Sequence, residues 1–259
     1  MNPGAEGAIP SFCVVVPMYN ERVGAETCVR RICAVLETIP LPNRLVVVND
    51  GSADGTGTIL DRLAGEFPAL TVLHHEKNAG YGAALRTGMR YAAESAFDYA
   101  LFMDSDLTND PADIPRFVEK MRQGYDVIKA TRYSNGGRVS GVPAYRVIIS
   151  RFGNALARRL YGLPVTDCTN GFRAVRTSLL RRMELTEARF SIIMEELYLC
   201  KLFAKSYAQV PVLLTNRRDQ QRPTSFVYSP GVFCRYLKYP LKSYFRIQPD
   251  GIREYEERR

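Results

Sequence analysis

Short apolar runs alternate with longer segments of helical periodicity through the first half of the chain. The apolar runs occupy residues 12–17, 45–49, 70–74, 99–103 and 126–130. Helix-like segments separate them at about residues 23–37, 56–66, 83–95 and 113–123. Continuous apolar strands separated by helices are typical of a parallel sheet that is covered on both faces. We therefore predict an α/β fold with a mostly parallel sheet and right-handed crossovers.

The second half of the chain is less regular. Residues 145–161 carry apolar side chains at helical spacing and are followed by Gly162 and Pro164, which predicts a helix with a defined end. A further helix is expected over residues 192–205 and a further strand over residues 207–214. Because the sequence contains no repeat and no clear linker, we predict a single domain over residues 1–226, followed by a basic amphipathic C-terminal part, residues 227–259.

This C-terminal part interleaves aromatic and basic residues, as in FCRYLKYPLKSYFR. Such a mixture suits a membrane interface, but it also suits a helix that packs on the domain while its basic ends reach water. No apolar stretch is long enough for a transmembrane helix, and the first residues lack the features of a secretory signal. A cytoplasmic location is therefore expected.

The net charge of +8 is concentrated in one stretch of the chain. Between Val127 and Met183 the only acidic residue is Asp167. The basic residues of the same stretch are Lys129, Arg132, Arg138, Arg146, Arg151, Arg158, Arg159, Arg173, Arg176, Arg181 and Arg182. This imbalance favours a polyanionic partner, and nucleic acid, an anionic membrane or a phosphorylated substrate would each satisfy it.

Polar residues follow each of the first four predicted strands. These clusters lie at residues 17–21, 49–52, 77–80 and 104–106. The carboxyl ends of parallel strands lie at one edge of a sheet, where open α/β proteins bind their ligands. We therefore expect the four clusters to form one site.

Asp104 and Asp106 are the most specific feature of these clusters. They follow an apolar strand and are separated only by Ser105, so both carboxylates can approach one point beyond the sheet edge. Oxygen ligands without histidine favour a hard divalent cation, Mg²⁺ or Mn²⁺. Such an ion would neutralise a diphosphate and act as a Lewis acid for its departure.

Several motifs resemble, in order, those of family 2 glycosyltransferases of the GT-A fold. They are VVVPMYNE, VVVNDGSADGT, KNAGYGAALRTGM, FMDSDLTNDP, ATRYSNGG and TDCTNGFRAVR. Their spacing is most similar to that of the dolichol-phosphate mannose synthase and polyprenyl-phosphate glycosyltransferase branch, from about Phe12 to Thr224. The resemblance implies a GT-A fold and a nucleotide-sugar donor of the GDP-mannose or UDP-glucose type, with one hexose transferred.

The resemblance also implies roles for individual residues. The nucleotide-sugar pocket would be lined by Pro17, Tyr19, Asn20, Glu21, Asp50, Asp54, Asn78, Gly80, Asp104, Ser105 and Arg173. Asp104 and Asp106 would hold the metal. Arg132 and Arg146 match positions that serve the acceptor phosphate or the donor diphosphate and complete the predicted catalytic set. For Arg173, within NGFR, a structural role competes with a contact to the sugar.

The chain departs from the family pattern in three places. Thr108 and Asn109 stand where close relatives often have glutamine as a third metal contact. Asn49 replaces a common aspartate, which leaves the choice between guanine and uracil open. The late arginine motif is only loosely present, and its candidates for contacting the acceptor phosphate are Arg217, Arg218 and Arg222.

The expected acceptor depends on whether the site offers a general base or mainly cationic side chains. An inverting transfer to a hydroxyl needs a general base, whereas a phosphomonoester is already anionic near pH 7 because its second pKa is about 6. The arginine-rich second half therefore favours a phosphate acceptor, and the resemblance implies that it is a polyprenyl or dolichyl phosphate. Glu195 and Glu196 lie where hydroxyl-using relatives carry their base, so a hydroxyl of a glycolipid or glycan is the alternative acceptor. The chain has no tryptophan and so lacks the QxxRW signature of processive synthases.

A lipid acceptor presents its phosphate at a bilayer surface. The helix expected over residues 145–161 and the C-terminal part are candidates for docking, so we predict peripheral association with the cytoplasmic face of a membrane. Many relatives continue into transmembrane helices, and a membrane-protein subunit could take their place. A basic module that binds membranes or nucleic acid without catalysis is a distant alternative. It leaves the carboxylate pair unexplained, so no nucleic-acid partner is expected.

Overall fold

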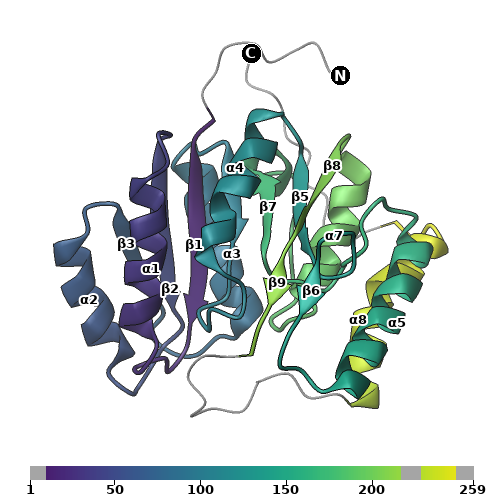
Figure 1. The fold of residues 1–259 in the computed structure, drawn as a ribbon, viewed down its shortest axis with the longest axis horizontal. Helices are drawn as coiled ribbons and strands as arrows, with labels where there is room; N and C mark the ends of the chain where they lie inside the picture. The colour runs from purple at the N-terminus through teal and green to yellow at the C-terminus, as the bar shows by residue number, and fades with distance from the viewer. Residues whose placement is uncertain (1–9, 217–228, 249–259) are drawn as a thin grey trace.

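A seven-stranded sheet forms the centre of the computed structural model, which describes residues 10–216 and 229–248 (Figure 1). Its strand order is β3-β2-β1-β4-β7-β5-β8. The strands are β1 (Phe12–Met18), β2 (Asn43–Asn49), β3 (Leu70–His74), β4 (Tyr99–Phe102), β5 (Val127–Thr131), β7 (Arg173–Arg176) and β8 (Tyr207–Pro211). A small second sheet pairs β6 (Arg138–Val139) with β9 (Leu213–Leu214).

Helices cover both faces of the large sheet, as the apolar runs predicted. They are α1 (Ala25–Glu37), α2 (Thr56–Glu66), α3 (Tyr81–Glu94), α4 (Ile114–Arg122), α5 (Ala144–Tyr161), α6 (Thr177–Leu180), α7 (Ile192–Phe203) and α8 (Pro230–Tyr244), with a 3-10 turn at Pro111–Asp113. One apolar core joins α1, α2 and α4 to the sheet. A second core, on the opposite face, contains α3, α6 and α7 together with parts of α5 and α8.

The predicted strands and helices are confirmed, with ends that differ by a few residues. The strand expected over residues 207–214 is in fact two strands, β8 and β9, which belong to different sheets. Strand β7 was not predicted. It is short, carries an arginine at each end, and runs antiparallel between β4 and β5, so its position depends on pairing with distant segments.

The site lies at a topological switch point of the sheet. From β1 the chain adds β2 and then β3 on one side, and it returns to place β4 on the other side of β1. The loops after β1 and β4 therefore diverge and leave a crevice at their carboxyl ends. Because β7 is antiparallel, its entry loop, residues 167–171, reaches the same edge.

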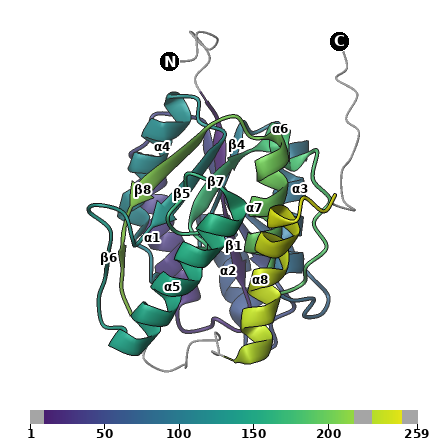
Figure 2. The same cartoon turned by 90° about the vertical axis from the view of Figure 1, so that its right-hand side faces the viewer.

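Helices α5 and α8 lie side by side at one end of the molecule (Figures 1 and 2). Helix α8 also packs on α7, and Tyr239 is buried there, whereas Tyr244 and Phe245 are 60% and 66% exposed. The packing of Tyr239 agrees with a helix that packs on the domain, and contact of the exposed side chains with a membrane stays a prediction. The predicted domain boundary after residue 226 lies outside the described residues. Among the helices that are described, none is long and apolar enough to cross a membrane.

Candidate active site

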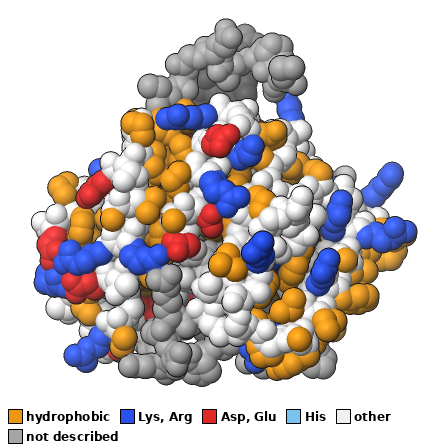
Figure 3. Space-filling model, in the orientation of Figure 1, with side chains coloured by type: hydrophobic (Ala, Val, Ile, Leu, Met, Phe, Trp, Pro, Cys, Tyr) orange, Lys and Arg blue, Asp and Glu red, His pale blue; other side chains and the backbone are white. Residues whose placement is uncertain are grey.

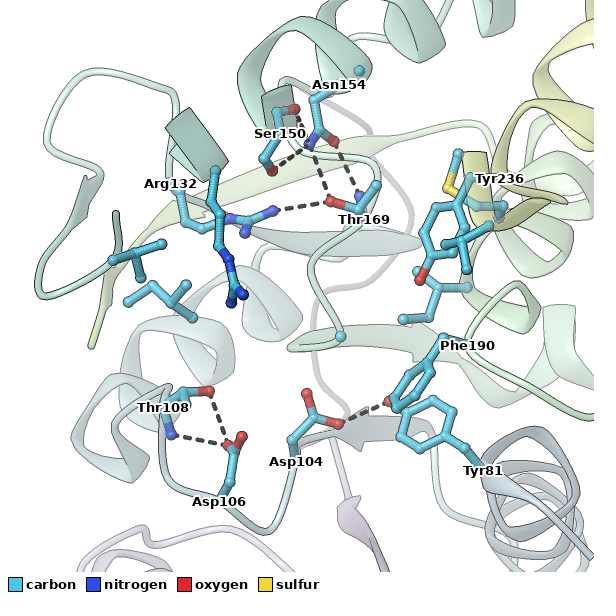
Figure 4. A pocket seen from close by; sticks show the side chains of 18 of the residues that line it. Tyr81, Asp104, Asp106, Thr108, Arg132, Ser150, Asn154, Thr169, Phe190 and Tyr236 are labelled. Carbon is cyan, nitrogen blue, oxygen red and sulfur yellow. Dashed lines mark hydrogen bonds between the residues drawn. The ribbon is translucent and has the colours of Figure 1, made fainter. Parts of the chain in front are cut away.

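An open cavity of about 810 Å³ lies at the carboxyl edge of the sheet (Figure 4). It brings together most of the predicted site residues, namely Pro17, Tyr19, Glu21, Asp50, Asn78, Gly80, Asp104, Ser105, Asp106, Arg132 and Arg146. Asn20, Asp54 and Arg173 do not line it. The three arginines expected between residues 217 and 222 lie outside the described residues.

Asp104 is held by a residue that the sequence did not single out. The hydroxyl of Tyr81, at the start of α3, donates a hydrogen bond of 2.8 Å to Oδ1 of Asp104. Burial and the nearby charge of Asp106 raise the pKa of Asp104 to about 6, against the opposing effects of Tyr81 and Arg173. Tyr81 belongs to the KNAGYG motif, but only the tertiary structure shows which group its hydroxyl contacts.

Asp106 is oriented by its own turn. Its Oδ1 accepts hydrogen bonds from the backbone nitrogen of Thr108 at 3.1 Å and from the Thr108 hydroxyl at 2.9 Å. Thr108, which departs from the family pattern, therefore orients a carboxylate and also lines the cavity. In Figure 4, Asp104 and Asp106 lie next to each other, across the pocket from Arg132.

The pair fits a divalent cation. Each carboxylate uses Oδ1 for the contacts above, and the described residues donate no hydrogen bond to either Oδ2. Within the same described ranges there is no cluster of three or more His, Cys, Asp or Glu side chains that could hold an ion. An ion at Asp104 and Asp106 would therefore complete its ligands with oxygens of a bound diphosphate, as Mg²⁺ commonly does in phosphate sites.

Arg132 is fixed to the 167–171 loop by a bidentate ion pair. Its Nε and Nη2 lie 2.7 and 2.8 Å from the two carboxylate oxygens of Asp167, and Nη2 also donates to the Thr169 hydroxyl at 2.9 Å. The carboxylate of Asp167 is fully buried, and although burial opposes it, the Arg132 charge keeps the pKa of Asp167 below its usual value. This fork holds the arginine at the cavity wall in one orientation.

Two further side chains hold the same loop from opposite sides. Asn154 of α5 accepts a hydrogen bond of 2.7 Å from the backbone nitrogen of Cys168 and donates one of 3.0 Å to Thr169. The buried ammonium of Lys129 donates a hydrogen bond of 2.8 Å to the carbonyl of Asn170. The loop that carries Gly171 to Asp104 is therefore anchored by both β5 and α5.

Asp50 organises the loop after β3. Its carboxylate accepts hydrogen bonds from the backbone nitrogens of Ala79 and Gly80 at 2.9 and 2.8 Å, and it lies 2.7 Å from Nδ1 of His75. Because both oxygens are used in this way, Asp50 shapes one side of the cavity through the backbone of Ala79 and Gly80 as well as by lining it.

Asn20 and Asp54 act next to the cavity, not in it. The Asn20 side chain accepts a hydrogen bond of 2.9 Å from the backbone nitrogen of Ala53, and Asp54 accepts one of 3.0 Å from that of Arg22. These contacts tie the loop after β1 to the loop after β2. The expectation that Asn20 and Asp54 line the pocket is therefore wrong, because both side chains are used in contacts between these loops.

Arg173 is fully buried and forms a bidentate ion pair with Glu196, at 2.5 and 2.6 Å. Because Arg173 is buried and does not line the cavity, the structure favours a structural role for it over a contact with the sugar. Glu195 is also buried and accepts hydrogen bonds from Thr186 and Glu187. Neither glutamate lines the cavity, so neither is placed to serve as a general base there.

The cavity continues away from the carboxylates between α5 and α8. Its walls there are mostly apolar and include Val147, Ala157, Val232, Phe233 and Leu237. Arg146, at the first turn of α5, lines the same space, and its guanidinium lies 5.9 Å from the centre of the Tyr145 ring. One cavity is therefore lined by carboxylates, arginines and apolar side chains together.

A cavity at the switch point of the sheet, lined by an Asp-x-Asp pair, is the arrangement that the resemblance to glycosyltransferases of the GT-A fold implies. Residues 13–183 match the family described as Glycosyl transferase family 2, and the chain belongs to this family. The Asp104 and Asp106 pair, the loop after β5 and the NGFR segment all fall within the matched range.

Over the aligned stretches, about one residue in three is identical between this chain and its curated relatives. It is 32% identical over 174 residues to the polyprenol monophosphomannose synthase of Mycolicibacterium smegmatis, covering 67% of this chain and 64% of the relative. It is 34% identical over 171 residues to the undecaprenyl-phosphate mannosyltransferase of Micrococcus luteus, covering 66% and 68%. Identity to the dolichol-phosphate mannosyltransferase of Pyrococcus furiosus is 34% over 186 residues, which are 70% of this chain and 51% of the relative. The chain thus spans roughly half to two thirds of these relatives.

Solved structures share the fold. Glucosyl-3-phosphoglycerate synthase from Mycobacterium tuberculosis, in complex with Mn²⁺, UDP and glucosyl-3-phosphoglycerate, superposes with a TM-score of 0.63 at 23% identity, over 93% of this chain and 82% of that one. Residues 1–349 of S. aureus TarS, in complex with UDP-GlcNAc, superpose with a TM-score of 0.57 at 20% identity, over 89% and 65%. These similarities establish the GT-A fold.

Proposed function

We propose that this chain is an inverting glycosyltransferase that moves one hexose from a nucleotide-diphosphate sugar to a polyprenyl or dolichyl phosphate at a membrane surface. The names of the curated relatives support this acceptor class. The observation that carries the proposal is the combination of groups in one cavity, which is lined by a carboxylate pair, by two arginines and by apolar side chains of α5 and α8.

The donor occupies the side of the cavity formed by β1, β2 and β4. Asp50, Asn78 and the backbone at Gly80 shape the nucleotide site, and Asp104 and Asp106 hold Mg²⁺ or Mn²⁺ against the diphosphate. When bound, the ion supplies charge neutralisation and Lewis acidity for the departing diphosphate. The chain itself orients both carboxylates, through Tyr81 and Thr108.

The acceptor side needs cations more than a base. The described cavity-lining residues include four carboxylates, Glu21, Asp50, Asp104 and Asp106, and all of them lie on the donor side. A phosphate acceptor is already anionic near pH 7, so Arg132 and Arg146 need only draw it toward the sugar and offset its charge. The buried positions of Glu195 and Glu196 support a phosphate over a hydroxyl acceptor.

The end of the molecule formed by α5 and α8 is suited to a membrane. Tyr145, Ile148 and Phe152 lie along α5 and are 58%, 67% and 67% exposed. In Figure 3 the corresponding right-hand side shows hydrophobic and basic side chains and no acidic ones. Exposed apolar and cationic groups together favour an anionic bilayer surface. Helix α5 carries these exposed residues and also lines the cavity through Arg146 and Val147, so we propose that the lipid reaches the arginines along this end of the molecule.

The test is transfer of radiolabelled mannose or glucose from GDP- or UDP-sugars to polyprenyl phosphate in anionic liposomes, with Mn²⁺. We expect a lipid-linked product that mild acid hydrolyses. Asp106→Asn should reduce the rate at least about a hundredfold, because the lost charge acts on the departing diphosphate, whereas Asp61→Asn at an exposed site should not change it. Transfer to a glycan hydroxyl, with no lipid-phosphate product, would contradict the proposal.

A separate experiment tests the membrane face. The protein should float with anionic liposomes that contain polyprenyl phosphate, and Ile148→Ser with Phe152→Ser should weaken flotation. The matched control is Leu202→Ser, which replaces an exposed apolar residue of α7. Flotation that is absent for the unmodified protein, with or without donor, would count against peripheral association.

A further inference from the structure

A strap formed by residues 184–191 crosses the first turn of α3. The backbone nitrogen of Gly82 donates a hydrogen bond of 2.8 Å to the carbonyl of Ala188. A Cβ atom at Gly80 would lie 2.5 Å from that carbonyl oxygen, and one at Gly82 would lie 2.1 Å from the carbonyl oxygen of Glu187. The strap can therefore lie directly on the helix only because these positions have no side chain.

The strap is linked to Asp104 through Tyr81. The ring of Phe190 packs on that of Tyr81, with centroids 4.5 Å apart. The Tyr81 hydroxyl in turn donates to Oδ1 of Asp104 at 2.8 Å (Figure 4). Movement of the strap would therefore move the ring that orients Asp104.

The same strap is bound to α8 by the side chain of Glu187. Its Oε1 accepts hydrogen bonds of 2.8 Å from both Lys238 and Tyr239, and its Oε2 accepts one of 2.7 Å from Ser191. Burial opposes the charge of this carboxylate, but the hydrogen bonds from Lys238, Ser191 and Tyr239 lower its pKa and keep it ionised. Helix α8 also lines the cavity, so it contacts both the acceptor passage and, through Glu187, the strap.

We propose that Glu187 is a positioning residue that couples the seating of α8 to the geometry of Asp104, through the contacts of Phe190 with Tyr81 and of Tyr81 with Asp104. Formation of the acceptor wall and orientation of the metal-binding carboxylate then depend on each other. This inference rests on the proposed function, since it assigns Asp104 to a metal. Groups that orient metal ligands commonly change metal affinity about 10- to 100-fold when they are removed.

The test measures Mn²⁺ affinity of the full chain, without turnover, from the electron paramagnetic resonance signal of the free ion in the presence of GDP or UDP. Tyr81→Phe should raise the dissociation constant of Mn²⁺ about tenfold. Glu187→Gln should raise it about threefold, the loss expected for a weakened charge-assisted hydrogen bond. If Glu187 acts through Tyr81, the double variant should bind no more weakly than Tyr81→Phe, because coupled effects do not add.

Two controls separate positioning from general destabilisation. Glu184→Gln removes the same charge from an exposed site on the strap, and Tyr91→Phe removes a hydroxyl from α3 that lies 3.3 Å from Thr71. Both should leave Mn²⁺ affinity unchanged. If Glu187→Gln does not fold, Tyr239→Phe removes one of the same hydrogen bonds and replaces it.

The outcomes are distinct. An affinity of Glu187→Gln equal to that of Glu184→Gln, or effects of Tyr81→Phe and Glu187→Gln that multiply, would overturn the coupling and leave the proposed function standing. Failure of the unmodified protein to bind Mn²⁺ with either nucleotide would overturn the proposed function itself.

Discussion

Gly171 lies against Asp104 where the entry to β7 meets the end of β4. A Cβ atom at position 171 would be 2.9 Å from Oδ2 of Asp104 and 3.2 Å from the Tyr81 hydroxyl. Glycine therefore keeps open the carboxylate oxygen that accepts no hydrogen bond from the described residues. The pairing of Phe102 with Arg173 in the antiparallel sheet is what brings these two positions together.

Gly171→Ala should disturb the metal site while leaving the fold intact. The added methyl group must displace the Asp104 carboxylate or the Tyr81 hydroxyl, so we expect Mn²⁺ affinity to fall about tenfold or more. Gly65→Ala is the control, because its Cβ would meet nothing within 4 Å on exposed α2. That variant should gain about 0.5–1 kcal/mol in urea unfolding without any change in Mn²⁺ affinity. Equal affinities in the two variants would contradict the geometry of Gly171.

Asp167→Asn should destabilise the protein by leaving the Arg132 guanidinium without its bidentate partner. We expect a loss of about 2–4 kcal/mol in unfolding free energy at pH 7, in line with broken buried pairs. The folded pKa of Asp167 is lowered, so its stabilising effect is present at neutral pH and is lost as the pH falls below about 4. The difference from the unmodified protein should therefore shrink at pH 3. Asp61→Asn, at a carboxylate that is 65% exposed, should change stability by less than about 0.5 kcal/mol at either pH.

The raised pKa of Asp104 predicts that its ionised carboxylate, which metal binding would need, lowers the stability of the metal-free protein. A folded-state pKa of about 6 means that the contribution of this carboxyl to stability is present in acid and is lost as the pH rises through 6. Asp104→Asn removes that loss, so the metal-free variant should melt about 2–4 °C higher at pH 7.5. Mn²⁺ with nucleotide should stabilise the unmodified protein at pH 7.5 but much less at pH 5, where protons compete for Asp104. A variant that melts lower than the unmodified protein would refute this.

Because of Lys129, the free energy of unfolding should increase with pH in the alkaline range. Burial, and then the charge of Arg173, lower the pKa of Lys129 from 10.5 to about 8. Between these values the unfolded chain binds a proton that the folded protein has released, so stability rises with pH. Relative to Lys129→Met, the unmodified protein should gain up to about 1.4 kcal/mol per pH unit in this window. Urea unfolding at pH 8, 9 and 10 measures it, and parallel curves for the two proteins would exclude the effect.

Much of the carboxylate end of the cavity could be predicted from the sequence because its signals are local. The apolar runs before Pro17, Asp50 and Asp104 have the length of buried strands, and helical segments between them require parallel pairing. Parallel strands necessarily end at one edge, so the polar clusters could be joined without coordinates. The Asp104 and Asp106 pair needed only its place after a strand and its two-residue spacing.

The acceptor side and the supporting contacts were decided by tertiary structure. Strand β7 has no periodic pattern of its own, and its antiparallel insertion alone carries Gly171 to Asp104. Arg173 and Glu196 form an ion pair in the protein interior, although charged side chains are usually exposed. The close backbone approach at Gly82 depends on Glu187, about a hundred positions away in the chain. The hydrogen bond of the Tyr81 hydroxyl depends on Asp104, about twenty positions away. A sequence pattern encodes which residues face a core, whereas contacts between distant loops depend on how the packed elements are finally arranged in space.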